Sequence, residues 1–146
     1  MKKNNPLQFD LKSSDYSKYK VLVIQTNWNY EVIKPMVDDC LTELKDKKID
    51  PEIVSVPGAY EIPFIAKKKA NYFDLIITMG AIIKGETPHF DIIAQTISDS
   101  IMHIGLTKET PIIFGVLTTN NLAQAEERAA QKGSEFALSG LNLLDN

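Results

Sequence analysis

Two patterns of apolar residues alternate along this chain. Short runs rich in Val, Ile and Leu, with few polar interruptions, are typical of strands buried on both faces of a parallel sheet. Four such runs occur, at residues 20–26, 52–56, 74–80 and 111–117. After each run, apolar residues recur every three or four positions, as they do on one face of a helix. The pattern therefore predicts four strands that alternate with helices.

The first two helices are predicted from this spacing alone. One covers about 30–47, although Pro35 requires either that it begin near Lys34 or that its first turn be distorted, because proline suits only the first turn. The next covers 60–71 and ends in a run of lysines.

Residues that favour helix ends mark the last two helices. The Thr87-Pro88 pair predicts a helix start, with a hydroxyl cap followed by proline at the first helical position. Asn121, with Gln124 three residues later, resembles a capping box. Gly133 breaks the helical pattern that follows, and the pattern resumes over 135–144.

Strands that alternate with helices at this spacing form βαβ units and a parallel sheet. The predicted fold is α/β, a flavodoxin-like three-layer α/β/α sandwich with a four-stranded parallel sheet. Residues 1–18 are predicted to be an N-terminal arm, with a possible extra edge strand around 7–11, and residues 19–146 a single domain. In such folds ligands bind outside the carboxyl ends of the strands.

Composition narrows the function classes. The 146 residues carry a formal net charge of −3, which argues against nucleic acid or an anionic membrane as the main partner. One cysteine, Cys40, and two histidines, His89 and His103, leave no cluster for a metal site. The longest apolar stretch, at 75–83, is far shorter than the roughly 20 residues that span a bilayer. These features predict a cytoplasmic, metal-free domain without a secretory signal.

Polar and aromatic residues follow each predicted strand. His89 lies in the first turn of a helix, where the backbone N–H groups favour an anion, and a histidine there can transfer protons. Gly85-Glu86-Thr87 has a glycine and a hydroxyl that could hold a phosphate. Each feature alone also has an ordinary role: His89 as a cap or packing residue, the turn as a simple loop.

Three further side chains are candidates. Trp28, the only tryptophan, can stack on a planar heterocycle or plug the end of the core. Glu61 can accept from sugar hydroxyls or favour its helix start. Arg128, the only arginine, suits a phosphate or an exposed ion pair. His103 and Cys40 are predicted to be structural.

Two common functions of this fold are excluded by missing motifs. A dinucleotide fold would have G-x-G-x-x-G after the first strand, where this chain has TNWNYE. A receiver domain would have carboxylates after the first and third strands, where this chain has Gln25-Thr26 and Met79-Gly80.

Four motifs, in this order, are similar to those of one enzyme family. They are VPGAYEIP at 56–63, MGAIIKGETPHFD at 79–91, IFGVLTT at 113–119 and AEERA at 125–129. Together they resemble 6,7-dimethyl-8-ribityllumazine synthase, and the similarity covers about residues 20–145.

The resemblance implies an activity and an assembly. The family condenses 5-amino-6-(D-ribitylamino)uracil with 3,4-dihydroxy-2-butanone 4-phosphate, releasing phosphate and water, in the penultimate step of riboflavin biosynthesis. It uses neither a metal nor an organic cofactor. Its active sites form between neighbouring protomers, which implies a homo-oligomer, a pentamer or a multiple of one, with small-molecule substrates.

The resemblance also implies roles for individual residues. His89 takes the proton-transfer position. The residues implied to bind the ribitylaminouracil are Trp28, Ala59, Tyr60, Glu61, Ala81, Ile82, Ile83 and, from the neighbouring subunit, Phe114. Those implied to bind phosphate are Gly85, Glu86, Thr87 and Arg128.

The chain departs from the family in three places. Trp28 replaces a usual phenylalanine and offers a larger face that would suit flavins. Glu86 brings a carboxylate into the phosphate turn. The link over 128–133 is about four residues shorter than usual, which leaves Lys132 as the candidate for a lysine usual there. Trp28 and the shortened link leave one alternative open, a non-catalytic paralogue that binds a flavin or a lumazine. A third hypothesis, a purely structural shell protein, is disfavoured because the polar site residues are all present.

Overall fold

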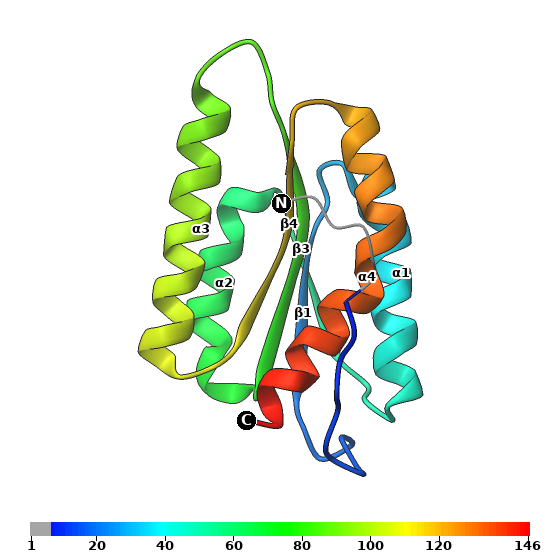
Figure 1. The fold of residues 1–146 in the computed structure, drawn as a ribbon. Helices are drawn as coiled ribbons and strands as arrows, with labels where there is room; N and C mark the ends of the chain where they lie inside the picture. Colours follow the sequence, from blue (N-terminus) through cyan, green and yellow to red (C-terminus); the bar gives the residue numbers. More distant parts are fainter. Residues whose placement is uncertain (1–6) are drawn as a thin grey trace.

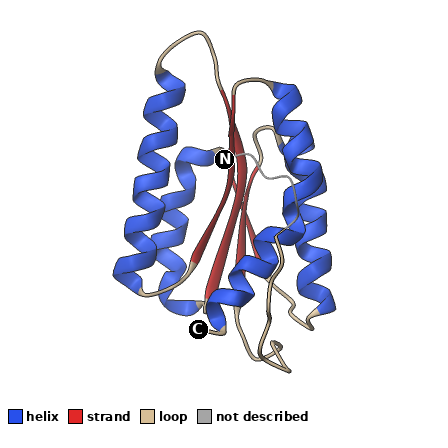
Figure 2. Ribbon diagram, in the orientation of Figure 1, coloured by secondary structure: helices blue, strands red, loops and turns tan. Residues whose placement is uncertain are grey.

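A computed structural model describes residues 7–146. Its centre is a four-stranded parallel sheet with the order β2-β1-β3-β4 (Figure 2). The strands are β1 (Val21–Thr26), β2 (Glu52–Val56), β3 (Leu75–Ile83) and β4 (Ile112–Thr119). All three strand pairs are parallel, with Val23 opposite Ile77 and Thr78 opposite Phe114 in the two pairings of β3. The four predicted strands are thus confirmed.

Helices cover both faces of the sheet. The helices are α1 (Tyr30–Asp46), α2 (Ile62–Lys69), α3 (His89–Lys108) and α4 (Leu122–Leu144), with single 3₁₀ turns at Ala59–Glu61 and Ala70–Tyr72. Helices α2 and α3 lie on one face, α1 and α4 on the other (Figure 1). This arrangement confirms the three-layer α/β/α sandwich. None of the helices within residues 7–146 is long and apolar enough to cross a membrane.

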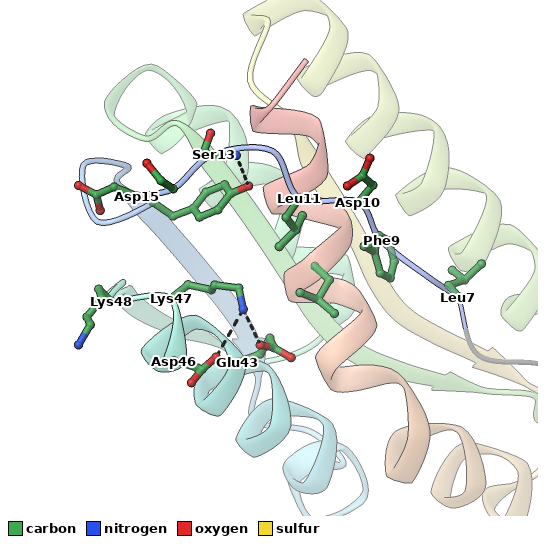
Figure 3. A pocket seen from close by; sticks show the side chains of 13 residues that line it. Leu7, Phe9, Asp10, Leu11, Ser13, Asp15, Glu43, Asp46, Lys47 and Lys48 are labelled. Carbon is green, nitrogen blue, oxygen red and sulfur yellow. Dashed lines mark hydrogen bonds and ion pairs between the residues drawn. The ribbon is translucent and has the colours of Figure 1, made fainter.

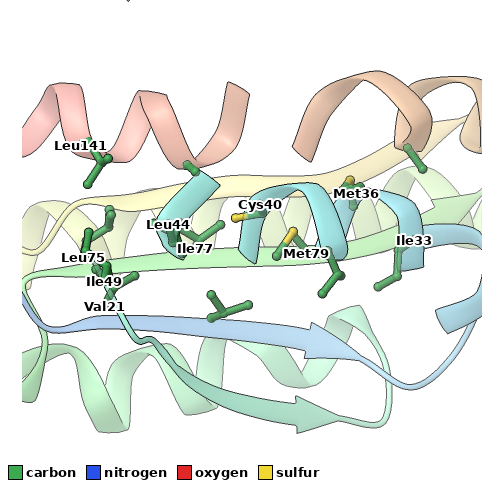
Figure 4. Close-up of a cluster of buried hydrophobic side chains, with 14 of the residues drawn as sticks. Val21, Ile33, Met36, Cys40, Leu44, Ile49, Leu75, Ile77, Met79 and Leu141 are labelled. Atoms are coloured by element: carbon green, nitrogen blue, oxygen red, sulfur yellow. The ribbon is translucent and has the colours of Figure 1, made fainter. Parts of the chain in front are cut away.

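Two apolar cores hold the layers together. Between the sheet and the α1/α4 layer lie buried side chains that include Ile33, Met36, Leu44, Ile77 and Leu141 (Figure 4). A second core lies between the sheet and the α2/α3 layer, with these members among others: Leu22, Ile24, Ile62, Ile76, Ile97 and Ile101. Strands β1 and β3 contribute alternate side chains to the two cores, so both faces of each strand are buried. This is why their sequences are almost continuously apolar.

Cys40 belongs to the first core, as the sequence predicts. Its side chain is fully buried on the inner face of α1. Burial, with a smaller contribution from the negative charge of Glu43, raises the pKa of the Cys40 thiol to about 12. Since the thiolate is the reactive form, this cysteine cannot serve as a nucleophile in the folded protein.

The predicted break at Gly133 is wrong, because α4 continues from Leu122 to Leu144. Gly133 is buried where α4 crosses α1: a Cβ at this position would lie 2.2 Å from the Met36 carbonyl oxygen and 2.7 Å from Asp39 Cβ. The glycine therefore permits close approach of two helices, although glycine lowers helix propensity.

Other helix ends differ by small amounts from those predicted. Helix α1 begins at Tyr30 and contains Pro35, so the start near Lys34 is wrong. Helix α3 begins at His89 with Pro88 as its N-cap, one residue later than predicted. The helix expected over 60–71 is a regular helix only from Ile62 to Lys69, with a 3₁₀ turn on each side.

The N-terminal arm lies outside the sheet in the part of the chain that the structure describes. Residues 7–11, where an extra edge strand is predicted as possible, are not a strand. The extra strand is therefore not confirmed. Residues 1–6 of the arm lie outside the described residues.

The burial of Cys40 predicts slow reaction with thiol reagents. The folded protein should react with a disulfide reagent at pH 8 only at the rate of its opening, because neither access nor ionisation is available in the native state. In denaturant, one equivalent should react at once, since Cys40 is the only cysteine. Fast labelling without denaturant would contradict the described packing.

The helix crossing predicts that Gly133→Ala destabilises the fold. The added methyl group must push α4 from α1, and we expect a loss of about 3 kcal/mol of unfolding free energy, measured by urea denaturation. Gly85→Ala is the matched control, because its Cβ would meet no atom within 4 Å. Equal stability of the two variants would show that the helices adjust without cost.

Candidate active site

A cavity of about 310 Å³ opens at the carboxyl ends of β1 and β3, beside the first turns of α2 and α3. Most of the residues selected from the sequence line it. They are Trp28, Ala59, Tyr60, Glu61, Ala81, Ile82, Ile83, Gly85, Thr87 and His89. They come from three stretches of the chain, at 28, 59–61 and 81–89, which lie tens of residues apart in the sequence, and the loops after β3 and β4 reach the same end of the sheet (Figure 1). The parallel sheet therefore forms this site.

Trp28 lies on the rim of the cavity, in the short loop between β1 and α1. Its backbone N–H donates to the Pro57 carbonyl at 3.0 Å, and the Asn27 N–H donates to the Val56 carbonyl at 2.8 Å. These bonds fix the loop to the end of β2. The side chain itself is 62% exposed, so Trp28 does not plug the core. An exposed indole on a cavity rim is available for stacking on a planar ring.

The turn before α2 forms the adjacent wall. The Gly58 N–H donates to Glu61 Oε2 at 3.1 Å, so the carboxylate bends back over its own turn. Glu61 thus acts as part of a capping box while it also lines the cavity. Tyr60, between them, is 61% exposed and also lines the cavity.

The apolar floor comes from the end of β3. Residues 81–83, counted as a loop in the sequence prediction, belong to the strand. Ala81, Ile82 and Ile83 pair with residues 117–119 of β4, and the Lys84 N–H continues the pattern by donating to the Thr119 carbonyl at 2.8 Å. The floor is therefore rigid strand, with backbone positions fixed by its neighbour.

His89 is the first residue of α3 and follows a turn that begins at Gly85. Its backbone N–H donates to Thr87 Oγ1 at 3.4 Å, a long contact. The ring is exposed to solvent and lines the cavity. The start of a 20-residue helix beside this turn favours an anion, because the first backbone N–H groups lack helical partners. Glu86, in the same turn, is exposed and does not line the cavity.

Phe114 and Arg128 lie elsewhere. They line a separate recess of about 340 Å³, between the edge strand β4 and α4. Arg128 Nη1 donates to the Thr118 carbonyl at 3.4 Å. Among the described residues, none lines both the cavity and this recess. A single chain therefore does not bring these two predicted site residues to the other ten.

Three residues that line the cavity were not selected from the sequence. Gly58 precedes the 3₁₀ turn, and Phe90 and Ile93 lie on the first turns of α3. Ile93, four positions after His89, shares its helix face, and that spacing was the available signal. Ile93 also packs, partly buried, against the core between the sheet and the α2/α3 layer.

The described lining of the cavity lacks the cationic side chain that commonly helps a protein to bind phosphate. Among the described residues that line it, none is a lysine or an arginine. The recess beside β4, in contrast, holds Arg128 and Lys132, the latter paired with Glu135 at 3.2 Å. Within residues 7–146, no group of three or more His, Cys, Asp or Glu side chains could hold a metal ion.

The family model and three curated relatives agree on one family. The family model described as 6,7-dimethyl-8-ribityllumazine synthase matches residues 18–146. Three curated relatives carry that name. The one from Leuconostoc mesenteroides is 36% identical over 146 residues, covering 94% of each chain. Those from Cutibacterium acnes and Thermobifida fusca are each 37% identical, over 86% and 82% of this chain and 76% and 75% of theirs.

One solved structure, the MID domain of N. crassa QDE-2 AGO, covers 87% of this chain and 95% of its own at 13% identity, with a TM-score of 0.35, which is too low to bear on the fold. The match to the family model, in contrast, spans all the strands, the helices and the cavity described above. The chain belongs to the 6,7-dimethyl-8-ribityllumazine synthase family.

Proposed function

We propose that this protein condenses 5-amino-6-(D-ribitylamino)uracil with 3,4-dihydroxy-2-butanone 4-phosphate to form 6,7-dimethyl-8-ribityllumazine, phosphate and water. The observation that carries the proposal is the single cavity that collects Trp28, the 59–61 turn, the end of β3 and His89. Family membership supports the same reaction. Nothing in the described residues favours a non-catalytic or purely structural alternative.

The pyrimidine substrate fits the apolar part of the cavity. Its planar ring would stack on Trp28 above the floor of Ala81, Ile82 and Ile83. The ribityl hydroxyls would lie along the 59–61 turn, where the Glu61 carboxylate and backbone groups can accept and donate. Rigid walls matter because the two substrates must be held in reacting geometry, and this positioning supplies a large share of the acceleration.

His89 is the proposed proton-transfer group. The amine of one substrate attacks the ketone of the other and forms an imine with loss of water; phosphate then leaves, and a second amine closes the ring with loss of water. Each step moves a proton, and His89 is the only histidine on the cavity wall among the described residues. A well-placed imidazole can both accept and return these protons.

Phosphate would bind at the turn formed by Gly85, Glu86 and Thr87. The turn can supply backbone N–H groups and the Thr87 hydroxyl, together with the favourable field of the α3 start. It lacks a cation from its own chain in the described lining. Arg128 from a neighbouring copy would provide the guanidinium, and Phe114 from that copy would cover the ring.

This arrangement requires head-to-tail contact between copies of the chain. The cavity on one copy would face the β4/α4 recess of the next, and two different surfaces in contact generate a ring when the rotation between successive copies closes. We therefore propose a homo-oligomer, a pentamer or a multiple of one. Exposed apolar side chains on the α2/α3 layer, Phe64, Ile92, Met102 and Leu106, agree with association of copies.

We also propose that the protein acts in the cytoplasm. Its partners would be small-molecule substrates, and we propose no nucleic acid partner for this acidic chain.

Replacing His89 should lower turnover without unfolding the protein. His89→Ala is expected to reduce kcat by about 100-fold, because it removes the proposed proton shuttle from an exposed position. His103→Ala is the matched control, since His103 is also exposed on α3 but does not line the cavity. The rate is measured by lumazine absorbance. Turnover in His89→Ala equal to that of the control would remove His89 from this role.

Mixing two inactive variants tests whether sites form between copies. Co-expression of His89→Ala and Arg128→Ala chains in equal amounts should restore about a quarter of wild-type activity, because random rings place an intact cavity beside an intact Arg128 at about one interface in four. Each variant expressed alone is the control. If the mixture stays at the level of the single variants, Arg128 does not act across an interface.

A further inference from the structure

The N-terminal arm is fixed to the end of α4 through one carboxylate. Asp145, the cap residue after α4, accepts from the Lys12 N–H at 2.7 Å and from Ser13 Oγ at 2.8 Å. It also accepts from the Tyr16 hydroxyl, at 2.7 Å to Oδ2 and 2.9 Å to Oδ1. The Tyr16 hydroxyl in turn accepts from the Ser13 N–H at 3.2 Å. Such a mutually satisfied network fixes a single geometry.

Apolar packing supports the same attachment. Tyr16 is only 4% exposed and belongs to the core between the sheet and the α1/α4 layer. Leu11 packs against that core from the arm. The arm thus joins the folded domain at two levels, through a polar anchor on Asp145 and through buried side chains.

From this anchor the arm runs back along α4 (Figure 3). Leu11, Asp10, Phe9 and Leu7 follow one another along the arm, away from Ser13, with Leu11 at the helix and Phe9 and Leu7 beside it (Figure 3). The chain from residue 13 to residue 7 spans about 20 Å when extended. The axis of α4 from Asp145 back to Lys132 has the same length, about 20 Å. The arm therefore reaches the middle of α4 with little slack.

The end of this span reaches the recess that holds Phe114 and Arg128. We call this recess the half-site, because under the proposed function it completes the cavity of a neighbouring copy. Leu7 lines the recess together with Phe114, Arg128 and Phe136. Arg128 has only one hydrogen bond at 3.4 Å in the described structure, to the Thr118 carbonyl. Its long side chain would otherwise sample many rotamers, so an apolar neighbour that narrows this freedom lowers the entropy cost of binding an anion.

We propose that Tyr16 and Asp145 are positioning residues for the Phe114/Arg128 half-site, because they hold the arm so that Leu7 packs against that recess. This inference rests on the proposed function, in which Arg128 and Phe114 complete the cavity of a neighbouring copy. Neither Tyr16 nor Asp145 touches substrate. They act through Leu7 on the phosphate-binding arginine.

Tyr16→Phe is the sharpest variant, because it keeps the buried ring and removes only the hydroxyl that donates to Asp145. The KM for the phosphorylated substrate should rise about fivefold, with kcat within about twofold of wild type. Leu7→Ala should raise KM by a similar factor, again with kcat within about twofold of wild type. The KM of the double variant Tyr16→Phe/Leu7→Ala should be no higher than that of either single variant, because both residues act along one chain of contacts. Asp145→Asn offers a second way to weaken the anchor without changing side-chain size.

Tyr72→Phe is the matched control. Tyr72 is 70% exposed beyond α2, in the layer opposite the arm, and its hydroxyl has no part in the anchor. A rise in KM in Tyr16→Phe but not in Leu7→Ala, or a rise in the control as large as in Tyr16→Phe, would overturn the inference. Additive effects in the double variant would also overturn it.

Hydrogen exchange provides a readout that does not need activity. The Lys12 amide, which donates to Asp145, should be protected in the wild type and exchange faster in Tyr16→Phe. Unchanged protection would overturn the anchor itself. A wild-type protein without synthase activity would overturn the proposed function and the positioning role with it, whereas an active enzyme whose KM is equal in all variants would overturn only the positioning role.

Discussion

The pairing of β1 with β3 is the contact on which the rest of the molecule depends. These two strands are buried on both faces, and between them they supply side chains to both cores. Their parallel direction brings the loop that carries Trp28 and the turn that leads to His89 to one end of the sheet. Pairing of β3 with β4 then extends far enough to make residues 81–83 a rigid floor.

Because the sheet is open, a single chain leaves its two edge strands, β2 and β4, each unpaired on one side. The recess beside β4 holds the lone arginine of the chain, whereas the described lining of the cavity holds no cation. In the site that we propose, the helix start and the guanidinium that would bind the phosphate thus lie on two different surfaces. This separation is the physical reason to expect a neighbouring copy, which would supply the cation that the cavity of an acidic chain lacks.

Helix α4 connects several of these features. It crosses α1 closely at Gly133, carries Arg128 along its outer part, and ends at Asp145, where the arm is attached. The continuity of α4 matters because a rigid helix keeps a fixed distance between the anchor and the recess. A break at Gly133 would have allowed the two ends to move independently.

The sequence by itself determined the strands, the helix faces and the three-layer fold, because these follow from local periodicity and from residues such as Asn121, whose side chain accepts from the Gln124 N–H. It also led to ten of the residues that line the cavity: five of them, Trp28, Glu61, Gly85, Thr87 and His89, were candidates because parallel strand ends converge, and the other five came from the family resemblance. Only the tertiary structure decided the role of Gly133, the inclusion of residues 81–83 in a strand, the exposure of Trp28 and the separation of Arg128 from the cavity. Each of these depends on a neighbour that lies far away in the sequence, and local pattern carries no information about distance across the fold.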